Sequence, residues 1–165
     1  MNIDNLTQQE LKKQLHYNPD TGLFTRLVTN SSRVKVGDIC KNYSNGYIVF
    51  RVNSVLYKAH RLAWLYMTGN FPKYFIDHIN GITNDNRFFN LRECNNAENA
   101  QNIKKPRINN KSGYLGVSWE KNNLKYVAKI CIDGNRKRLG LYENAEDAHE
   151  AYLKAKRELH AFCTI

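Results

Sequence analysis

The stretch that decides the fold is residues 76–102, IDHINGITNDNRFFNLRECNNAENAQN, in which an aspartate and a histidine precede a series of asparagines. Asp77 and His78 are adjacent, and Phe75 and Ile76 lead into them as the beginning of a strand. Neighbouring side chains on a regular strand point to opposite faces of the sheet. These two residues can therefore serve one site only if the strand twists or ends there.

The residues after this strand predict a loop, a second strand and a helix. Gly81 and the polar residues around it favour a turn or a looped excursion, and residues 90–94 can form a short second strand. Asn95 or Asn96 is a suitable N-cap for a helix over residues 97–103. The resulting unit of strand, loop, strand and helix is too small to bury a core of its own.

Several landmarks of this stretch occur in an order that is found in a known family. They are Asp77-His78, Gly81, Asp85-Asn86-Arg87, Asn90-Leu91-Arg92 and Glu98-Asn99. The order resembles the HNH nuclease family, which has the ββα-metal fold, and is most similar to the variant with asparagine at the second and third signature positions. The resemblance implies that Asp77 and Asn99 are the protein ligands of one divalent cation. It also implies that His78 is the general base and that Asn90 orients the loop and the histidine.

The chemistry of these residue types agrees with the roles that the resemblance implies. A hard cation such as Mg²⁺ prefers oxygen ligands, keeps several waters and needs only one or two protein groups besides a substrate phosphate. A neutral imidazole has an unperturbed pKa near ~6.5, so it can accept a proton from water near neutral pH. We therefore expect a divalent metal cofactor, Mg²⁺ with Mn²⁺ as an alternative.

A structural interpretation of the same residues stays open. Asparagine is frequent throughout the chain, with pairs at 95/96, 109/110 and 122/123, so a match at Asn90 or Asn99 alone has little weight. These residues can simply cap turns of a loop. The combined order of the landmarks favours a catalytic metal site over a structural loop.

Length and composition describe a basic chain with a polyanionic partner. The 165 residues suffice for one domain or for two small domains that share an interface. The formal net charge is +10, and residues 101–140 contain ten basic residues against only Glu120 and Asp133. No apolar run approaches the ~20 residues of a membrane helix, and the polar residues 1–5 do not resemble a signal peptide. We expect a cytoplasmic protein, in the host cell cytoplasm if it is phage-encoded.

The cysteines do not form a metal-binding pattern. The chain has four, at positions 40, 94, 131 and 163, and none belongs to a C-x-x-C pair. A zinc ribbon, which some relatives of this nuclease class contain, therefore has no support in the sequence. Reduced thiols are expected in a cytosolic protein.

The residues before the nuclease stretch predict two helices and several strands. Thr7 and Glu10 form a capping box at the start of a helix whose apolar face continues through Leu11 and Leu15. A strand is expected over residues 23–27, and a hairpin over residues 46–59 with its turn at Asn53-Ser54. A helix over residues 60–67 follows, and Gly69 and Pro72 end it.

The role of His60 at the start of that helix stays open. Its position before Arg61 and Leu62 resembles a recurrent feature of this nuclease subfamily, which makes a DNA or phosphate contact one interpretation. A hydrogen-bonded structural histidine is the other.

The last third of the chain predicts three antiparallel strands and a helix. The strands are expected over residues 113–119, 125–130 and 136–140, and the second turn contains a favourable Asp-Gly pair. A helix capped by Asn144 follows, with Ala145, Ala148, Ala151, Tyr152, Ala155 and Leu159 on one face as its core side. This arrangement, with its Gly-Val, Leu-Gly and alanine landmarks, resembles the plant ethylene-response-factor type of DNA-binding domain.

That resemblance implies that the sheet lies in the major groove of DNA. The family's arginines on either side of Gly-Val are Leu115 and Ser118 here, so its base readout cannot be transferred to this chain. For any one cation, a phosphate contact is favoured over base reading. We expect DNA contacts from Arg61, Arg87, Lys104, Lys105, Arg107, Lys111, Trp119, Lys125, Lys129, Arg136 and Arg138.

Together these features predict an α+β fold, in which a ββα-metal nuclease module precedes a three-stranded antiparallel sheet packed on one helix. The expected domains are an HNH nuclease domain over residues 1–103, a basic linker over 104–111 and an ethylene-response-factor-like DNA-binding domain over 112–165. The predicted function is that of a metal-dependent DNA endonuclease of homing or mobile-element type, which acts on double-stranded DNA as a monomer or homodimer.

Two other functions stay open. The chain is a non-catalytic DNA-binding protein if the HNH-like part serves only as a scaffold, and the presence of Asp77, His78 and Asn99 favours the enzyme. RNA binding is less favoured because the usual exposed aromatic sheet motif is not visible.

Overall fold

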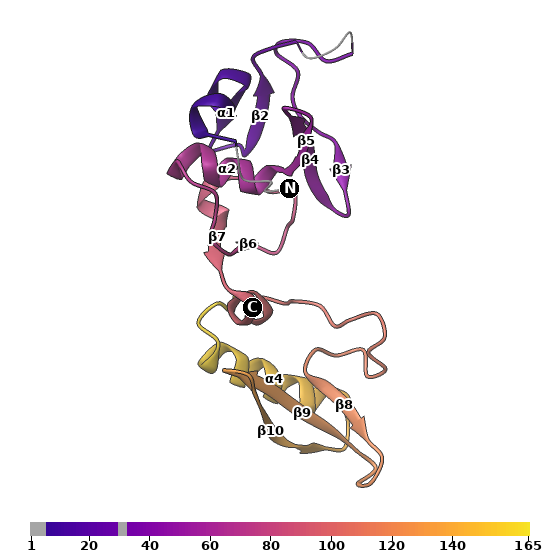
Figure 1. Ribbon diagram of the computed structural model, residues 1–165. Coiled ribbons are helices and arrows are strands. Elements are labelled where there is room, and N and C mark those ends of the chain that lie inside the picture. Colours follow the sequence, from indigo (N-terminus) through magenta and orange to yellow (C-terminus); the bar gives the residue numbers. More distant parts are fainter. Residues whose placement is uncertain (1–5, 30–32) are drawn as a thin grey trace. The chain divides into compact units, whose positions relative to one another are not determined.

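The structure is a computed structural model that describes residues 6–29 and 33–165 (Figure 1). The polar residues 1–5 lie outside the described residues. The chain divides into two compact units, Met1–Cys94 and Asn95–Ile165, and each has its own cluster of buried apolar side chains. All strand pairs are antiparallel and the units combine helices with sheets, which confirms the predicted α+β class.

The first unit begins with a capped helix and a short hairpin. Helix α1, Gln8–Gln14, has the predicted capping box between Thr7 and Glu10. Leu15 does not continue the helix as expected, because its extended backbone ends α1 and begins strand β1, Leu15–Asn18. Strand β1 pairs with β2, Leu23–Arg26, across a turn over residues 19–22.

A second antiparallel sheet contains β3 (Tyr43–Ser44), β4 (Tyr47–Val52) and β5 (Val55–Lys58). The predicted hairpin is confirmed, and both turn residues between β4 and β5 have positive φ, 48° at Asn53 and 66° at Ser54. Such angles match the twist of the two strands in a tight two-residue turn.

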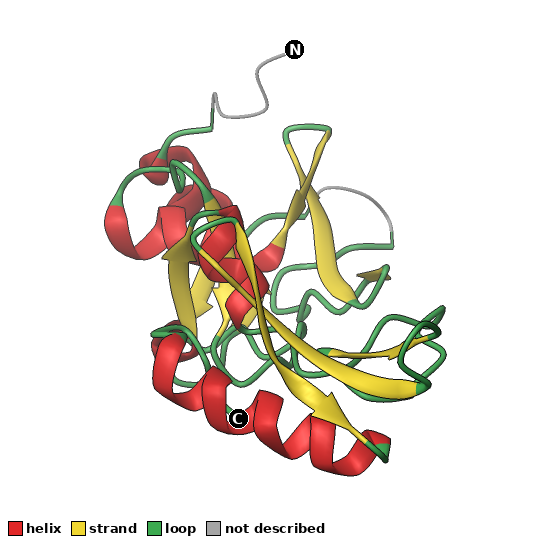
Figure 2. Cartoon of the chain, turned by 90° about the horizontal axis from the view of Figure 1, so that it is seen from below, coloured by secondary structure: helices red, strands yellow, loops and turns green. Residues whose placement is uncertain are grey.

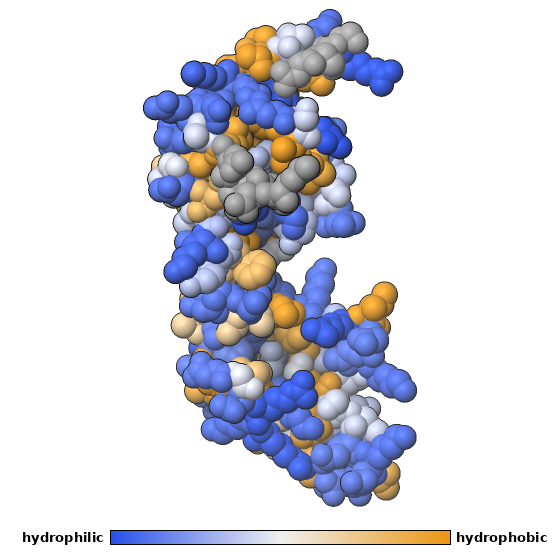
Figure 3. Space-filling view, in the orientation of Figure 1, coloured by the Kyte–Doolittle hydropathy of each residue, from blue (hydrophilic) through white to orange (hydrophobic). Residues whose placement is uncertain are grey.

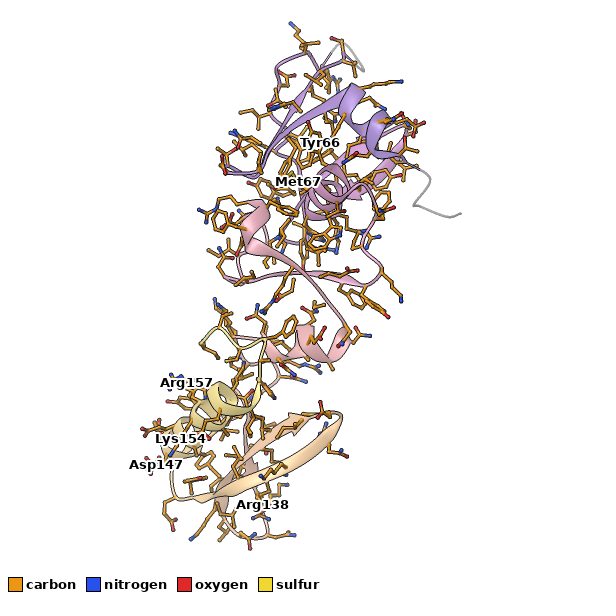
Figure 4. The ribbon with its side chains drawn as sticks, turned by 90° about the vertical axis from the view of Figure 1, so that its left-hand side faces the viewer. Tyr66, Met67, Arg138, Asp147, Lys154 and Arg157 are labelled. Carbon is orange, nitrogen blue, oxygen red and sulfur yellow. The ribbon has the colours of Figure 1, made fainter. Side chains whose placement is uncertain are left out.

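Helix α2, Ala59–Thr68, follows β5 directly and supplies much of the first core. It ends at Gly69 in the left-handed conformation, with φ 85°, as the sequence predicts. Tyr66, labelled on α2 in Figure 4, packs against Tyr17 and Phe24 of the first hairpin. The helix therefore connects the N-terminal hairpin to the rest of this unit.

The nuclease stretch forms the expected short hairpin. Strand β6, Phe75–His78, pairs with β7, Leu91–Cys94, and a single 3-10 turn, η1 (Phe88–Asn90), precedes β7. Helix α3, Asn96–Gln101, follows in the second unit and has a capping box between Asn95 and Glu98. The prediction of strand, loop, strand and helix in this order is confirmed, although the helix ends two residues earlier than expected.

The second unit contains the predicted three-stranded sheet and long helix. The strands β8 (Val117–Glu120), β9 (Lys125–Ile132) and β10 (Asn135–Tyr142) lie in the order β10-β9-β8. Helix α4, Ala145–Leu159, crosses one face of this sheet (Figure 2). Strand β8 begins four residues later than predicted.

The core of the second unit lies between α4 and the sheet. Val117, Ala128 and Ile130 pack with Ala148 and Tyr152, which confirms the helix stripe as a core face. Leu159 was predicted on the same face but is exposed, because it is the last residue of α4. Across residues 6–29 and 33–165, no helix combines the length and the apolar character that crossing a membrane requires.

Candidate active site and DNA-binding surface

Asp77 and His78 lie at the end of β6, and both side chains are buried. Asp77 is opposite Arg92 of β7, and its Oδ2 accepts hydrogen bonds from Arg92 Nε at 2.9 Å and Nη2 at 2.8 Å. This ion pair neutralises the buried carboxylate. The strand ends at His78, so one of the two alternatives that allow a shared site, a twist or an end of the strand, is met.

His78 is oriented by an amide and by two other rings. Its Nε2 lies 3.2 Å from Oδ1 of Asn86, a residue that is itself almost completely buried. An amide oxygen only accepts, so this contact selects the tautomer with the proton on Nε2 and the lone pair on Nδ1. The rings of Tyr47 and His60 lie 6.1 Å and 5.1 Å from the His78 ring, centroid to centroid. Burial lowers the pKa of His78, and its hydrogen bond with Asn86 opposes that shift.

His60 lies in the interior beside His78. Burial is the main reason why its pKa falls from 6.5 to about 3, and electrostatic interactions with His78 and Lys58 add to this shift. The ring is therefore neutral at pH 7, and it makes T-shaped contacts with the rings of Tyr47 and His78. This environment corresponds to the structural interpretation of His60 rather than to a surface phosphate contact.

Asn90, at the end of the loop between β6 and β7, bonds to the start and the middle of that loop. Its Oδ1 accepts from the backbone N–H of Asn80 at 2.9 Å, and its Nδ2 donates to the carbonyl oxygen of Asp85 at 2.8 Å. The side chain is buried, so these bonds are protected from water. The geometry suits the orienting role that the family resemblance implies, which stays a prediction.

A charged cluster fixes the tip of the same loop. Asp85 accepts from Arg87 Nε at 2.7 Å and Nη2 at 2.5 Å, and from Asn80 Nδ2 at 2.7 Å. The bond with Arg87 is the main reason why the pKa of Asp85 falls to about 2. Arg87 also stacks over the ring of Phe89. Its expected DNA contact stays a prediction, and here its guanidinium holds the loop.

The N-terminal hairpin supports this loop from a distant part of the sequence. The Tyr17 hydroxyl donates to the carbonyl oxygen of Asn86 at 2.6 Å, and the N–H of Phe88 donates to the carbonyl oxygen of Pro19 at 2.9 Å. Sequence reasoning did not identify Tyr17 or Asn86 as part of the site. Asn86 was visible only as a landmark of the loop, and Tyr17 gave no signal because its partner is 69 positions away.

The predicted metal ligands belong to different compact units. Asp77 lies in the first, and Asn99 lies on α3 in the second, where its side chain is exposed. Their joint role as ligands stays a prediction. Among residues 6–29 and 33–165, no group of three or more His, Cys, Asp and Glu side chains could hold a metal ion. A carboxylate and an amide oxygen nonetheless fit a hard cation that keeps several waters.

The sheet of the second unit carries four of the ten predicted DNA-binding cations on one face. The register places Lys125, Lys129, Arg136 and Arg138 on the face opposite α4, and Arg138 is labelled on that sheet in Figure 4. Lys125 pairs with Glu143 at 2.7 Å, and Arg138 pairs with Glu120 at 2.8 Å. Hydrophilic side chains cover most of the visible face of this unit (Figure 3).

Trp119 does not share that face. It pairs in register with Tyr126, and both belong to the side of the sheet that faces α4. The indole is 46% exposed because it lies beyond the packed core. Because β8 is an edge strand of this sheet, we expect the DNA contact of Trp119 at the sheet edge.

The basic segment 104–111 contains neither helix nor strand and is grouped with the second unit. Lys105, Arg107 and Lys111 are exposed in it. Its two ends are attached, because Lys156 donates to the carbonyl oxygen of Ile103 and Ser112 Oγ lies 2.8 Å from the Val117 carbonyl oxygen. The DNA contacts predicted for this segment stay predictions.

The model of the HNH endonuclease family matches residues 57–101, which extend from β5 through α3. The chain thus contains an HNH endonuclease domain, which supports a nuclease of the general kind and implies DNA as its substrate. HNH nucleases generally use a divalent metal ion.

Among the curated proteins, Protein 3.8 of Escherichia phage T7 is 33% identical over 108 residues, which cover 63% of this chain and 88% of the phage protein. The chain belongs to the family of this phage protein. No solved structure matches the chain. The resemblance of the C-terminal part to ethylene-response-factor domains is not confirmed by these comparisons and stays a prediction.

Proposed function

We propose that this protein is a metal-dependent DNA endonuclease that hydrolyses phosphodiester bonds, of the homing or mobile-element type that the sequence suggests. The observation that carries the proposal is the buried His78, held through Nε2 by Asn86 at the end of the strand that also bears Asp77. This group lies inside the region that matches the HNH endonuclease family.

In this proposal His78 is the general base. The contact with Asn86 fixes the ring in the tautomer whose Nδ1 can take a proton from the attacking water. The lowered pKa keeps the imidazole neutral, and therefore basic, near pH 7. Asn90 holds the loop that carries Asn86 by bonding to the backbone of Asn80 and Asp85, so it acts as a positioning residue.

Asp77 and Asn99 are the residues that would hold the divalent cation. When bound, such a cation neutralises charge that develops on the phosphate and on the leaving 3′ oxygen. Arg92 keeps the Asp77 carboxylate in place and balances its charge inside the protein. The expected products have 5′-phosphate and 3′-hydroxyl ends.

The second unit is proposed to supply much of the affinity for double-stranded DNA. Its sheet presents four cations on one face, and the segment 104–111 adds further basic side chains. Contacts of this kind release counterions from the phosphate backbone, so binding should weaken steeply as salt rises.

The test is incubation of supercoiled plasmid with the protein and Mg²⁺ or Mn²⁺, with EDTA as the metal-free control. We expect nicked or linear product with metal, and none with EDTA or with the His78→Ala and Asp77→Ala variants. DNA binding of His78→Ala, measured by fluorescence anisotropy, should stay nearly intact. His16→Ala is the matched control, because His16 is an exposed histidine of the same unit and should cleave like the parent protein. Undiminished cleavage by His78→Ala would refute the assignment.

A non-catalytic DNA-binding protein is the second candidate, and the Asp77–Arg92 ion pair is the observation in its favour. Arg92 places a positive charge 2.8 Å from Oδ2 of the carboxylate that is proposed to bind the cation. This function predicts tight DNA binding with no cleavage in Mg²⁺ or Mn²⁺ and no binding of Mn²⁺ by calorimetry. The endonuclease predicts Mn²⁺ binding that Asp77→Ala abolishes.

A further inference from the structure

The second unit contains a hollow of about 520 Å³ between segment 106–112 and strand β8. Its walls are mostly apolar, and the exposed indole of Trp119 is one of them. The lining includes three cations and no acidic residue. The full set is Pro106, Arg107, Asn109, Asn110, Lys111, Ser112, Leu115, Val117, Ser118, Trp119 and Lys121.

The outer wall of this hollow is held by hydrogen bonds. Asn110 Nδ2 donates to the carbonyl oxygen of Tyr114 at 2.9 Å, and Asn110 Oδ1 accepts from the backbone N–H of Ser112 at 2.9 Å. Ser112 Oγ lies 2.8 Å from the Val117 carbonyl oxygen at the start of β8. The segment is thus tied to the strand beside it, and the hollow does not depend on a ligand for its shape.

A second hollow of about 250 Å³ adjoins the first. The two share Asn110, Val117 and Ser118 in their linings. In contrast to the first, the second contains Lys129 and Arg136, which lie on the outer face of the sheet. It also has no acidic residue in its lining, so its field favours an anion.

We propose that these two adjoining hollows bind a single unstacked nucleotide of a DNA strand. The base occupies the apolar hollow against the indole of Trp119, and the phosphate occupies the hollow with Lys129 and Arg136. Aromatic stacking and a cationic groove are the two features with which proteins bind single-stranded nucleic acid. An apolar wall with a cationic rim fits the two halves of a nucleotide, and its volume lies in the range of small-molecule sites.

This inference rests on the proposed function only because it takes DNA as the bound strand. It also adds to that function a preferred substrate, which is DNA with an unpaired nucleotide. A fully paired duplex keeps its bases stacked, whereas a bulge or gap offers one base without the free energy of unstacking. The protein should therefore prefer DNA with an unpaired nucleotide over the same duplex fully paired.

The experiment uses the full chain in EDTA, so that cleavage does not interfere. The chain has two tryptophans, and Trp64→Phe leaves Trp119 as the only indole reporter. We expect a duplex with a one-nucleotide bulge to quench Trp119 emission and to bind about tenfold more tightly than the paired duplex, which corresponds to the stacking of one base. Trp119→Ala should abolish the preference, and Trp119→Phe should keep part of it.

A matched pair of charge variants tests the phosphate half. Arg136→Gln should weaken binding of the bulged duplex several-fold more than Lys137→Gln, because Lys137 is the neighbouring residue on β10 and does not line either hollow. Circular dichroism checks that each variant keeps its helix and sheet content.

The outcomes separate this inference from the nuclease proposal. Equal affinity for bulged and paired DNA, or unchanged Trp119 emission on binding, overturns the nucleotide site. Tighter binding of a bulged RNA duplex than of the DNA bulge also overturns it and identifies RNA as the partner. If the protein prefers the bulged duplex but does not cleave plasmid in Mg²⁺, only the endonuclease proposal is refuted.

Discussion

Replacement of Gly22 by alanine should damage the candidate active site from outside the matched HNH region. Gly22 ends the turn between β1 and β2 with φ +72°. A Cβ at this position would lie 2.5 Å from both the backbone nitrogen of Arg87 and the backbone carbonyl carbon of Asn86. Those atoms belong to the loop that presents Asn86 to His78. They are backbone atoms, so they cannot turn away as the end of a flexible side chain can.

The expected loss in the free energy of unfolding has two contributions. An alanine in the left-handed region costs about 1–2 kcal/mol relative to glycine. Forcing an extra carbon into a packed interior costs about 1–3 kcal/mol more, because the loop or the turn must move. Gly22→Ala should therefore lower the free energy of unfolding of the first unit by about 2–5 kcal/mol.

Gly37→Ala is the matched control. Gly37 lies in the same unit with φ +89°, but a Cβ there meets nothing within 4 Å. This variant has the backbone strain without the close contact, so the difference between the two variants isolates the contact. That difference should be about 1–3 kcal/mol.

The assay is urea unfolding followed by the fluorescence of Trp64 in a Trp119→Phe background. Trp64 packs on Phe88, whose N–H bonds to Pro19 in the turn, so the reporter lies close to the perturbed contact. At temperatures where Gly22→Ala stays folded, its plasmid cleavage should also fall at least about tenfold, which corresponds to ~1.4 kcal/mol in the barrier. If Gly22→Ala unfolds and cleaves like Gly37→Ala, the hairpin does not support the loop.

Three further predictions concern other parts of the chain. Because the pKa of His60 in the folded chain is lowered to about 3, the unfolded chain binds an additional proton between that pH and 6.5. The stabilising contribution of neutral His60 should be complete above pH 6.5, and the free energy of unfolding should fall by on the order of 3–5 kcal/mol toward pH 3. His60→Gln should flatten this pH dependence in unfolding curves. Gly116→Ala places a Cβ 2.1 Å from the ring of Tyr152, so it should destabilise the second unit by about 2–5 kcal/mol in thermal melts. Lys156→Met removes the buried donor to the Ile103 carbonyl oxygen and should lower the stability of the second unit by about 1–3 kcal/mol. Tryptic cleavage of the basic segment 104–111, which follows Ile103, should therefore become faster.

Gly134→Ala is the matched control for Gly116→Ala. Gly134→Ala has a similar φ of +81° with open space around it, and an equal loss in both glycine variants would contradict the contact with the helix. An unchanged pH dependence in His60→Gln would show that other groups control acid unfolding. For Lys156, the exposed neighbour variant Lys154→Met should leave the rate of tryptic cleavage unchanged.

The features that the sequence predicted correctly depend on residues close together in the chain. The capping box at Thr7 needs only a glutamate three positions later, and the N-cap at Asn95 needs only a short polar side chain before the helix. The turn at Asn53-Ser54 needs two residues that tolerate positive φ between two apolar segments. In these cases the hydrogen-bond partners lie within one turn of backbone, so local composition determines them.

Strand β1 shows how local patterns can be ambiguous. Leu11 and Leu15 are four positions apart, which favours a helix, whereas Leu15 and Tyr17 are buried on alternate positions of a strand. Two alternations are too few to outweigh a helical period. The outcome depends on pairing with β2 and on the bond from Tyr17 to Asn86, a partner that no local pattern reveals.

The register of β6 and β7 explains why the electrostatics of the candidate site could not be inferred from the sequence. Ile76, Asp77 and His78 pair with Glu93, Arg92 and Leu91. A slip by one residue would place Asp77 opposite either Leu91 or Glu93, and two carboxylates directly opposite each other repel. The ion pair with Arg92 therefore selects the one alignment in which the hairpin buries a neutralised aspartate beside His78. Arg92 was visible in the sequence as part of Asn90-Leu91-Arg92, but its role follows only once the pairing of the strands is known.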